Sequence, residues 1–465
     1  MTLYERVNSI EAVHGRTICQ CNIPRFILSL SAPAIAAQSI NALYNVVDRM
    51  YIGRIPVTGT MALTGVGLTF PIIMIISAFA ALVGFGGAPL ASIRMGAGKR
   101  AEAQRLLGNC FSMLVLLALV LTTLLLLFKT PLLRLFGASD DTLPYADSYL
   151  SVYLIGTISV QLALGLNQFI SAQGFAKTAM ATVCVGAALN IILDPILIFA
   201  CDMGVRGAAL ATVISQTVSA AWVLWFVCST RSTLRLRVQY LRISPRVMAS
   251  VLALGLSPFI MQSTESLVQI AFNTSMQSYG GDLYVSAIVI MSSVMQFFTM
   301  PVMGFAQGAQ PIIGFNYGAG NYDRVKSAAK YCAVFCLAFS LLLWGVAVFF
   351  PKLPVRVFTD DPAVVELAAQ IMPVFFLGMA IFGVQLALQQ VFIALGQAKV
   401  SIFIALLRKL ILLIPLVIIL PHFITPATDG VVLAEPIADI TAATTCCLLF
   451  AYKYRTLLRT SNKQA

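Results

Sequence analysis

Long apolar runs, separated by short polar segments, follow one another along almost the whole chain. Roughly 20 apolar residues cross the hydrocarbon core of a bilayer as a helix, and no polar stretch here is long enough to form a separate soluble domain. The pattern predicts an all-α polytopic membrane protein with twelve transmembrane helices. Six of them are expected near 26–52, 61–86, 106–128, 144–170, 178–200 and 205–228. Six more are expected near 249–276, 284–310, 327–350, 365–391, 400–421 and 430–452.

Composition agrees with this pattern. Of the 465 residues, 59% are hydrophobic and only 10% are charged, and the mean hydropathy is +0.90. Soluble domains carry roughly 25% charged residues to cover their surface. The solvent around most of this chain is therefore expected to be lipid.

Basic residues outnumber acidic ones, and the net charge is +12. Their placement argues against nucleic-acid binding, because they collect in short connections between apolar runs. The densest group contains Arg231, Arg235, Arg237, Arg242 and Arg246. Such clusters are typical of cytoplasmic loops. The distribution predicts that this connection and both termini lie in the cytoplasm.

An internal repeat divides the chain. The segment Gly96-Ala97-Gly98 recurs as Gly318-Ala319-Gly320, and Gly174 recurs as Gly396, in each case 222 residues later. Each copy holds six predicted helices, an even number, so both copies should have the same topology. We therefore expect two six-helix lobes related by a pseudo-twofold axis along the membrane normal, an arrangement found in transporters with alternating access.

The domain organisation follows from the repeat. The expected parts are an N-terminal lobe at 1–228, a basic cytoplasmic linker at 229–248, and a C-terminal lobe with a cytoplasmic tail at 249–465.

Several motifs resemble the multidrug and toxic compound extrusion (MATE) family. They are Asn41-Ala42-Leu43-Tyr44-Asn45-Val46-Val47-Asp48 with Ile52-Gly53, the two Gly-Ala-Gly loops, Asn190-Ile191-Ile192-Leu193-Asp194-Pro195, and Pro436-Ile437-Ala438-Asp439. The resemblance covers essentially the whole chain, and the pairing of Asp48 with Asp194 is similar to the DNA-damage-inducible branch of bacterial MATE proteins.

The resemblance implies ion-coupled export of organic, often cationic, amphiphilic compounds across a bacterial inner membrane, by a protein that acts as a monomer. A lipid-linked precursor flippase of the same superfamily is the alternative. The small number of bases expected inside the membrane argues against this alternative. We expect no enzymatic activity and no cofactor, and nothing in the sequence resembles an ATP-binding Walker loop.

The intramembrane candidates among the acidic residues are Asp48, Asp194, Glu265 and Asp439. A carboxylate at mid-membrane costs roughly 2.5–3.5 kcal/mol on insertion scales, so such residues usually have a function. Glu265 and Asp439 are candidates for coupling or for binding a substrate cation in the C-lobe. Equally, Glu265 could be a satisfied buried acid, and Asp439 could pack opposite Arg408 or Lys409, two bases in one predicted helix.

Asp48, Asn190 and Asp194 form the leading candidate site for protons or sodium. Asp48 lies roughly 33 Å along its helix from Phe26, and Asp194 roughly 24 Å along its helix from Thr178, so both belong to the outer half of the N-lobe. Asn190 shares a helix face with Asp194, four residues later. Neighbouring carboxylates disfavour double ionisation, which would let this pair take up a proton or a sodium ion. An alternative for Asp48 is an interfacial ion pair with a nearby arginine, and for Asp194 a structural hydrogen bond at a helix kink.

Overall fold

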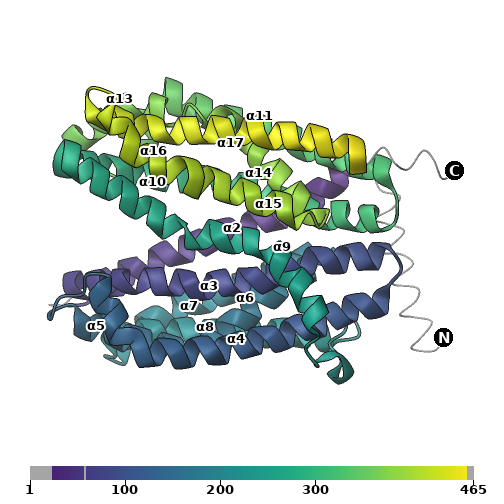
Figure 1. Cartoon of the computed structure of the whole chain (residues 1–465). Helices are drawn as coiled ribbons and strands as arrows, with labels where there is room; N and C mark the ends of the chain where they lie inside the picture. Colours follow the sequence, from purple (N-terminus) through teal and green to yellow (C-terminus); the bar gives the residue numbers. More distant parts are fainter. Residues whose placement is uncertain (1–22, 57–58, 360, 458–465) are drawn as a thin grey trace. The chain divides into compact units, whose positions relative to one another are not determined.

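The computed structural model describes residues 23–56, 59–359 and 361–457, in which only helices and their connections occur (Figure 1). The first half contains α2 (Ile23–Gly53), α3 (Gly59–Gly96), α4 (Arg100–Leu135), α5 (Leu143–Ile155), α6 (Thr157–Ala172), α7 (Ala176–Pro195), the π-helix η1 (Ile196–Ala200) and α8 (Gly204–Cys228). The second half contains η2 (Val238–Tyr240), α9 (Pro245–Ser263), α10 (Glu265–Gly318), α11 (Tyr322–Phe349), α12 (Lys352–Arg356), α13 (Pro362–Phe375), α14 (Met379–Ala394), α15 (Ala398–Leu406), the π-helix η3 (Leu407–Leu413), α16 (Ile414–Ile419), η4 (Leu420–His422) and α17 (Ala427–Leu457).

The described helices account for the predicted membrane spans. Nine helical segments are long and apolar enough to cross a membrane, and two bent helix pairs bring the number to eleven. One of the nine, Pro245–Gly318, is 74 residues long and contains Gly281 at φ 72° and ψ −170°, where two helices meet. Dividing the segment at Gly281 gives twelve spans, and the all-α fold predicted from the apolar runs is confirmed.

Two predicted spans are bent. The axes of α5 and α6 differ by 58°, as do those of α13 and α14. The first bend lies at Gly156 and the second at 376–378, close to the 222-residue offset of the repeat. The bend is therefore a feature of the repeated unit, which the apolar pattern alone did not indicate.

The repeated loops end their helices in the same way. Gly98 has a φ of 73° and Gly320 a φ of 76°, a left-handed conformation that glycine adopts without steric cost. Behind each glycine the chain turns back on the helix: Lys99 N donates to Arg94 O, and Asn321 N to Asn316 O, both at 2.9 Å. These bonds satisfy carbonyls at the helix end.

The chain forms two compact units. Among the described residues, unit 1 comprises those of 36–259, and unit 2 comprises those of 23–35 and 260–457. The passage from one unit to the other falls within α2 and within α9, in each case within two residues of a proline inside the helix, Pro33 or Pro258. Proline removes a backbone hydrogen bond and bends a helix. The first part of each of these helices thus belongs to the opposite unit from its last part.

Small residues let these helices pack closely within each unit. In unit 1, α9 approaches α3 so closely that a Cβ at Gly86 would collide with Val251 O. In unit 2, a Cβ at Gly304 would lie 2.8 Å from Ile35 Cα, where α2 crosses α10, and one at Gly308 would lie 2.5 Å from Ser31 Cα. Gly86 and Gly308 are again 222 residues apart, so both units use the same close contact, which small residues permit in membrane helices.

The exposed faces are apolar. On α4, the side chains of Leu119, Leu127 and Phe128 are 58%, 70% and 55% exposed, whereas Leu107 and Leu114 of the same helix are fully buried in the core of unit 1. A helix with leucine and phenylalanine on its exposed side fits a lipid environment.

The basic linker is ordered against unit 1. Gln173 Oε1 accepts hydrogen bonds from Ser232 Oγ at 2.9 Å and from Leu234 N at 2.8 Å, and Asn109 Nδ2 donates to Tyr240 O at 3.1 Å. Both termini are expected in the cytoplasm. They lie at 1–22 and 458–465, outside the described residues.

Candidate functional site

The structure brings Asp48 and Asp194 together in unit 1. Asp48 lies five residues before the end of α2, and Asp194 is the last residue but one of α7. Their carboxyl groups are within hydrogen-bonding reach of each other, and Asp194 is fully buried. Two residues separated by 146 positions in the sequence thus form one carboxylate pair.

Asn190 and Thr212 complete the group. Asn190 Nδ2 donates to Asp194 Oδ1 and to Thr212 Oγ1, both at 3.3 Å. Thr212 in turn donates to Ala208 O of its own helix, α8, at 3.1 Å. The amide nitrogen of Asn190 therefore bonds to one carboxylate and one hydroxyl, and the amide oxygen makes no hydrogen bond.

Three buried oxygen atoms of this group have no hydrogen-bond partner: Asp48 Oδ1, Asn190 Oδ1 and Asp194 Oδ2. An unsatisfied buried polar atom costs about 1–3 kcal/mol. Carboxylate and amide oxygens accept hydrogen bonds and ligate hard cations. The group is therefore suited to hold a positive charge between α2 and α7.

A cavity of about 600 Å³ opens beside the pair. It is bounded by α2, α3, α5, α6 and α8, and its lining includes Asp48, Tyr44, Tyr149, Tyr153 and Thr212. Tyr149 and Tyr153 are stacked, with their ring centroids 6.2 Å apart. The wall thus combines aromatic rings with hydroxyl groups around one carboxylate.

The end of α7 is shaped by Pro195, which has no backbone N–H. The α-helix ends at this residue, and the chain continues as the π-helix η1. A π-helical turn within an α-helix is rare and is frequent at functional sites. Asp194 thus lies where the regular hydrogen bonding of the helix is interrupted.

A second charged cluster lies in unit 2. Arg408 Nε donates to Asp439 Oδ1 at 2.6 Å, and Arg408 Nη2 donates to Glu435 Oε1 at 2.8 Å. The guanidinium also lies over the ring of Phe382, 4.3 Å from its centroid. The side chains of Arg408, Glu435 and Asp439 are 12%, 7% and 1% exposed, so one buried base faces two buried acids.

Lys409, the next residue, points to different partners. Its Nζ donates to Met261 O at 2.7 Å and forms an ion pair with Glu265. The Lys409 side chain is 8% exposed, whereas that of Glu265 is 70% exposed. The pair joins η3 to the break between α9 and α10, so Glu265 has a basic partner within its own unit.

The two consecutive bases belong to the π-helix η3. The wider turn of this helix presents Arg408 to α17 and Lys409 to α9 and α10. The predicted helix at 400–421 did not indicate this interruption.

Two residues of these sites were missed by the sequence analysis. Glu435 lies inside the predicted helix 430–452, one turn before Asp439, so its position in an apolar run was a usable signal. Thr212 gave no comparable signal, because a threonine in a membrane helix usually bonds to its own backbone.

Among the residues described, no group of three or more His, Cys, Asp and Glu side chains could hold a metal ion. Besides the two carboxylates, the group of Asp48 and Asp194 contains one amide and one hydroxyl, from Asn190 and Thr212.

Membrane-length helices in two repeated halves, with carboxylates buried beside a cavity, define a membrane transporter. The MatE family model matches the chain twice, at residues 33–196 and 258–419. These matches cover more than half of the chain, one in each half, and the protein belongs to the MATE family. The family membership predicted from the motifs is confirmed.

Related proteins and solved structures agree with the family membership. The multidrug export protein MepA of Staphylococcus haemolyticus is 25% identical over 401 residues, which cover 86% of this chain and 88% of that protein. The MATE multidrug transporter DinF-BH, solved in complex with R6G, is 36% identical, with a TM-score of 0.86 over 94% of this chain and 97% of that one. A MATE structure in a bent conformation has a TM-score of 0.90 at 23% identity, over 97% and 99% of the two chains.

Proposed function

We propose that this protein exports organic, cationic and amphiphilic compounds across a bacterial inner membrane in exchange for protons or sodium. The coupling cation is held by Asp48, Asp194 and Asn190 in unit 1. The group of three unpartnered buried oxygens on these side chains supports this proposal most strongly.

Charge explains why the site takes up a cation. Neighbouring carboxylates repel each other; for two unit charges about 4 Å apart, the repulsion is about 4 kcal/mol at an effective dielectric constant of 20. A shared proton or a bound sodium ion removes this repulsion and gives the free oxygens a partner. Occupancy of the site therefore changes the energy of the contact between α2 and α7.

The helix that carries Asp48 connects this change to transport. The first part of α2 belongs to unit 2, and its last part, with Asp48, belongs to unit 1. A cation that draws Asp48 toward Asp194 acts on a helix that both units share. A ligand shifts a conformational equilibrium only by its difference in affinity for the two states, and the carboxylate pair supplies such a difference.

The test is gradient-driven accumulation of a fluorescent organic cation in everted vesicles, whose lumen corresponds to the outside of the cell. Asp48→Asn and Asp194→Asn, singly and together, should abolish the acceleration of this export by the gradient, because the pair of carboxylates that a cation would neutralise is then lost. Asp141→Asn is the matched control, since Asp141 is exposed in the same unit. Full gradient-driven efflux by the double variant would refute the mechanism.

The coupling cation can be identified with the same protein in proteoliposomes. A pH gradient and a sodium gradient are imposed separately, and the gradient that drives efflux identifies the cation. The names of relatives such as the multidrug export protein MepA favour export of drug-like compounds over the lipid-linked precursor flippase. We also retain the cytoplasmic placement of both termini and a monomeric state as proposals.

A further inference from the structure

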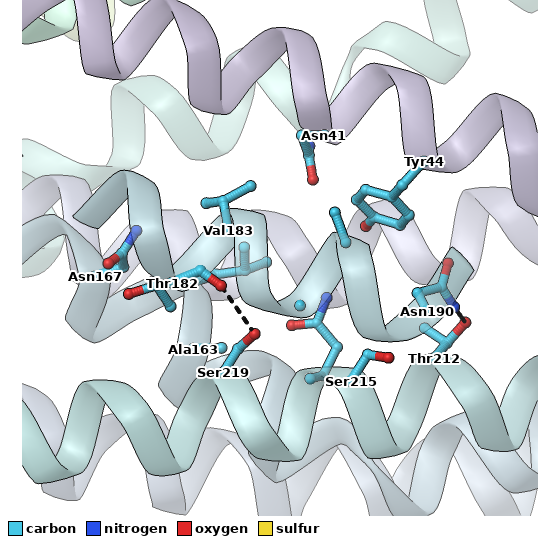
Figure 2. A pocket seen from close by; sticks show the side chains of 14 residues that line it. Asn41, Tyr44, Ala163, Asn167, Thr182, Val183, Asn190, Thr212, Ser215 and Ser219 are labelled. Carbon is cyan, nitrogen blue, oxygen red and sulfur yellow. Dashed lines mark hydrogen bonds between the residues drawn. The ribbon is translucent and has the colours of Figure 1, made fainter. Parts of the chain in front are cut away.

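A second, smaller cavity in unit 1 lies between α6, α7 and α8, with Asn41 and Tyr44 of α2 also lining it. Its volume is about 50 Å³, and Figure 2 shows its polar side chains in a row from Asn167 past Thr182, Ser219 and Ser215 to Asn190 and Thr212. The residues that line it include no acid and no base. At one end it reaches Asn190, which belongs to the carboxylate site.

Three buried oxygens along this cavity have no hydrogen-bond partner: Asn167 Oδ1, Ser215 Oγ and Asn190 Oδ1. The amide nitrogens of both asparagines are engaged, that of Asn167 with Ala179 O at 3.1 Å and that of Asn190 with Thr212. Their oxygens are thus left for another partner. Buried polar atoms in a polar cavity are normally satisfied by water. A water needs on the order of 10–15 Å³, so the cavity has room for about three to five.

The row extends along most of α7. Asn190 and Thr182 are eight residues apart on this helix, a rise of roughly 12 Å. Asn167 bonds to Ala179, one turn from the beginning of α7 at Ala176. The cavity therefore leads from Asn190, beside the carboxylate pair, toward the connection between α6 and α7, and its lining ends at Asn167 and Thr182.

We propose that this cavity holds a file of water molecules through which the coupling cation moves from the carboxylate pair toward the α6–α7 connection. The proposal rests on the proposed function and adds the route to its site. Neutral hydroxyl and amide groups suit such a route, because they solvate a cation without the strong attraction of a carboxylate. On the positive-inside distribution, the α6–α7 end faces the cytoplasm.

Gly186 keeps the route open. A Cβ at this position would collide with Ser219 Oγ, whose hydroxyl donates to Thr182 O at 3.2 Å. Gly186→Ala should therefore push the serine hydroxyl out of its place and fill the space of the waters, without touching the carboxylates. Ser215→Ala is a milder change that removes one unpartnered oxygen and adds no atoms.

The experiment measures transport by the full-length protein in proteoliposomes, with stopped-flow recording of cation-driven efflux. For Gly186→Ala we expect the maximal rate to fall about tenfold, equivalent to about 1.4 kcal/mol of barrier, at an unchanged apparent affinity for the coupling cation. Ser215→Ala should slow the rate less. Gly345→Ala is the matched control, because its Cβ would lie 3.9 Å from the nearest side-chain atom. Thermal unfolding of each variant establishes that it is folded.

A wild-type rate in both Gly186→Ala and Ser215→Ala would overturn the route. A lowered cation affinity at an unchanged maximal rate would also overturn it, because Gly186 would then act on binding. Asp194→Asn in the same preparation separates this outcome from failure of the proposed function. If Asp194→Asn keeps coupled efflux, the site itself is wrong; if it loses coupling while both cavity variants transport normally, only the route is wrong.

Discussion

Replacement of Arg408 by methionine tests the buried charge cluster of unit 2. Methionine is similar in length and is apolar, so the substitution removes the charge and leaves most of the volume filled. It takes from Glu435 and Asp439 their common partner, at distances of 2.8 and 2.6 Å. Both acids are at least nine-tenths buried, so water cannot replace the guanidinium without a rearrangement.

The expected cost follows from this burial. Removing one partner of a buried ion pair destabilises a protein by about 3–5 kcal/mol. For a unit of roughly 200 residues, each kcal/mol lowers the melting temperature by about 2–4 °C, so we expect a decrease of roughly 6–20 °C. The measurement is thermal unfolding of the purified protein in detergent, followed by intrinsic fluorescence.

Two further variants isolate the charge effect. Neutralising both acids, with Glu435→Gln and Asp439→Asn in the Arg408→Met background, should recover most of the lost stability, because neutral groups are far cheaper to bury than charges. Arg356→Met, at an exposed arginine in the same unit, should change stability by no more than about 0.5 kcal/mol. A melting temperature of Arg408→Met equal to that of the wild type would refute the reasoning.

Two other substitutions test the remaining contacts. Thr212→Val removes the hydroxyl that accepts a hydrogen bond from Asn190. We expect it to weaken the apparent affinity for the coupling cation about fivefold, corresponding to a hydrogen bond of about 1 kcal/mol. Thr212→Ser should restore the affinity, and equal affinities of Thr212→Val and the wild type in the transport assay would show that the contact is dispensable. Lys409→Met should lower stability by at most about 1 kcal/mol, far less than Arg408→Met, because Glu265 is 70% exposed and can be solvated. A melting temperature as low as that of Arg408→Met would contradict this ranking, and Glu265→Gln in the Lys409→Met background should then raise it.

Much of the fold was determined by the sequence alone. Twelve apolar runs of spanning length, repeated with a constant offset between glycine loops, leave few alternatives to two six-helix halves, because a helix is the form in which one segment satisfies its own backbone in lipid. The candidate acids Asp48 and Asp194 were also recognisable, because a carboxylate in an apolar run is rare enough to mark a site. Asn190 followed from its helical spacing to Asp194.

Only the tertiary structure decided which of these residues meet. Helical periodicity does not relate Thr212 to Asn190, Lys409 to Glu265, or Arg408 to Asp439. It also does not indicate that α2 and α9 are each divided between the two units. Periodicity specifies the face of a helix on which a side chain lies, but not the neighbour that this face meets. The neighbour is set by the packing of helices that come together only in the folded chain, and the open cavity beside Gly186 is a product of the same packing.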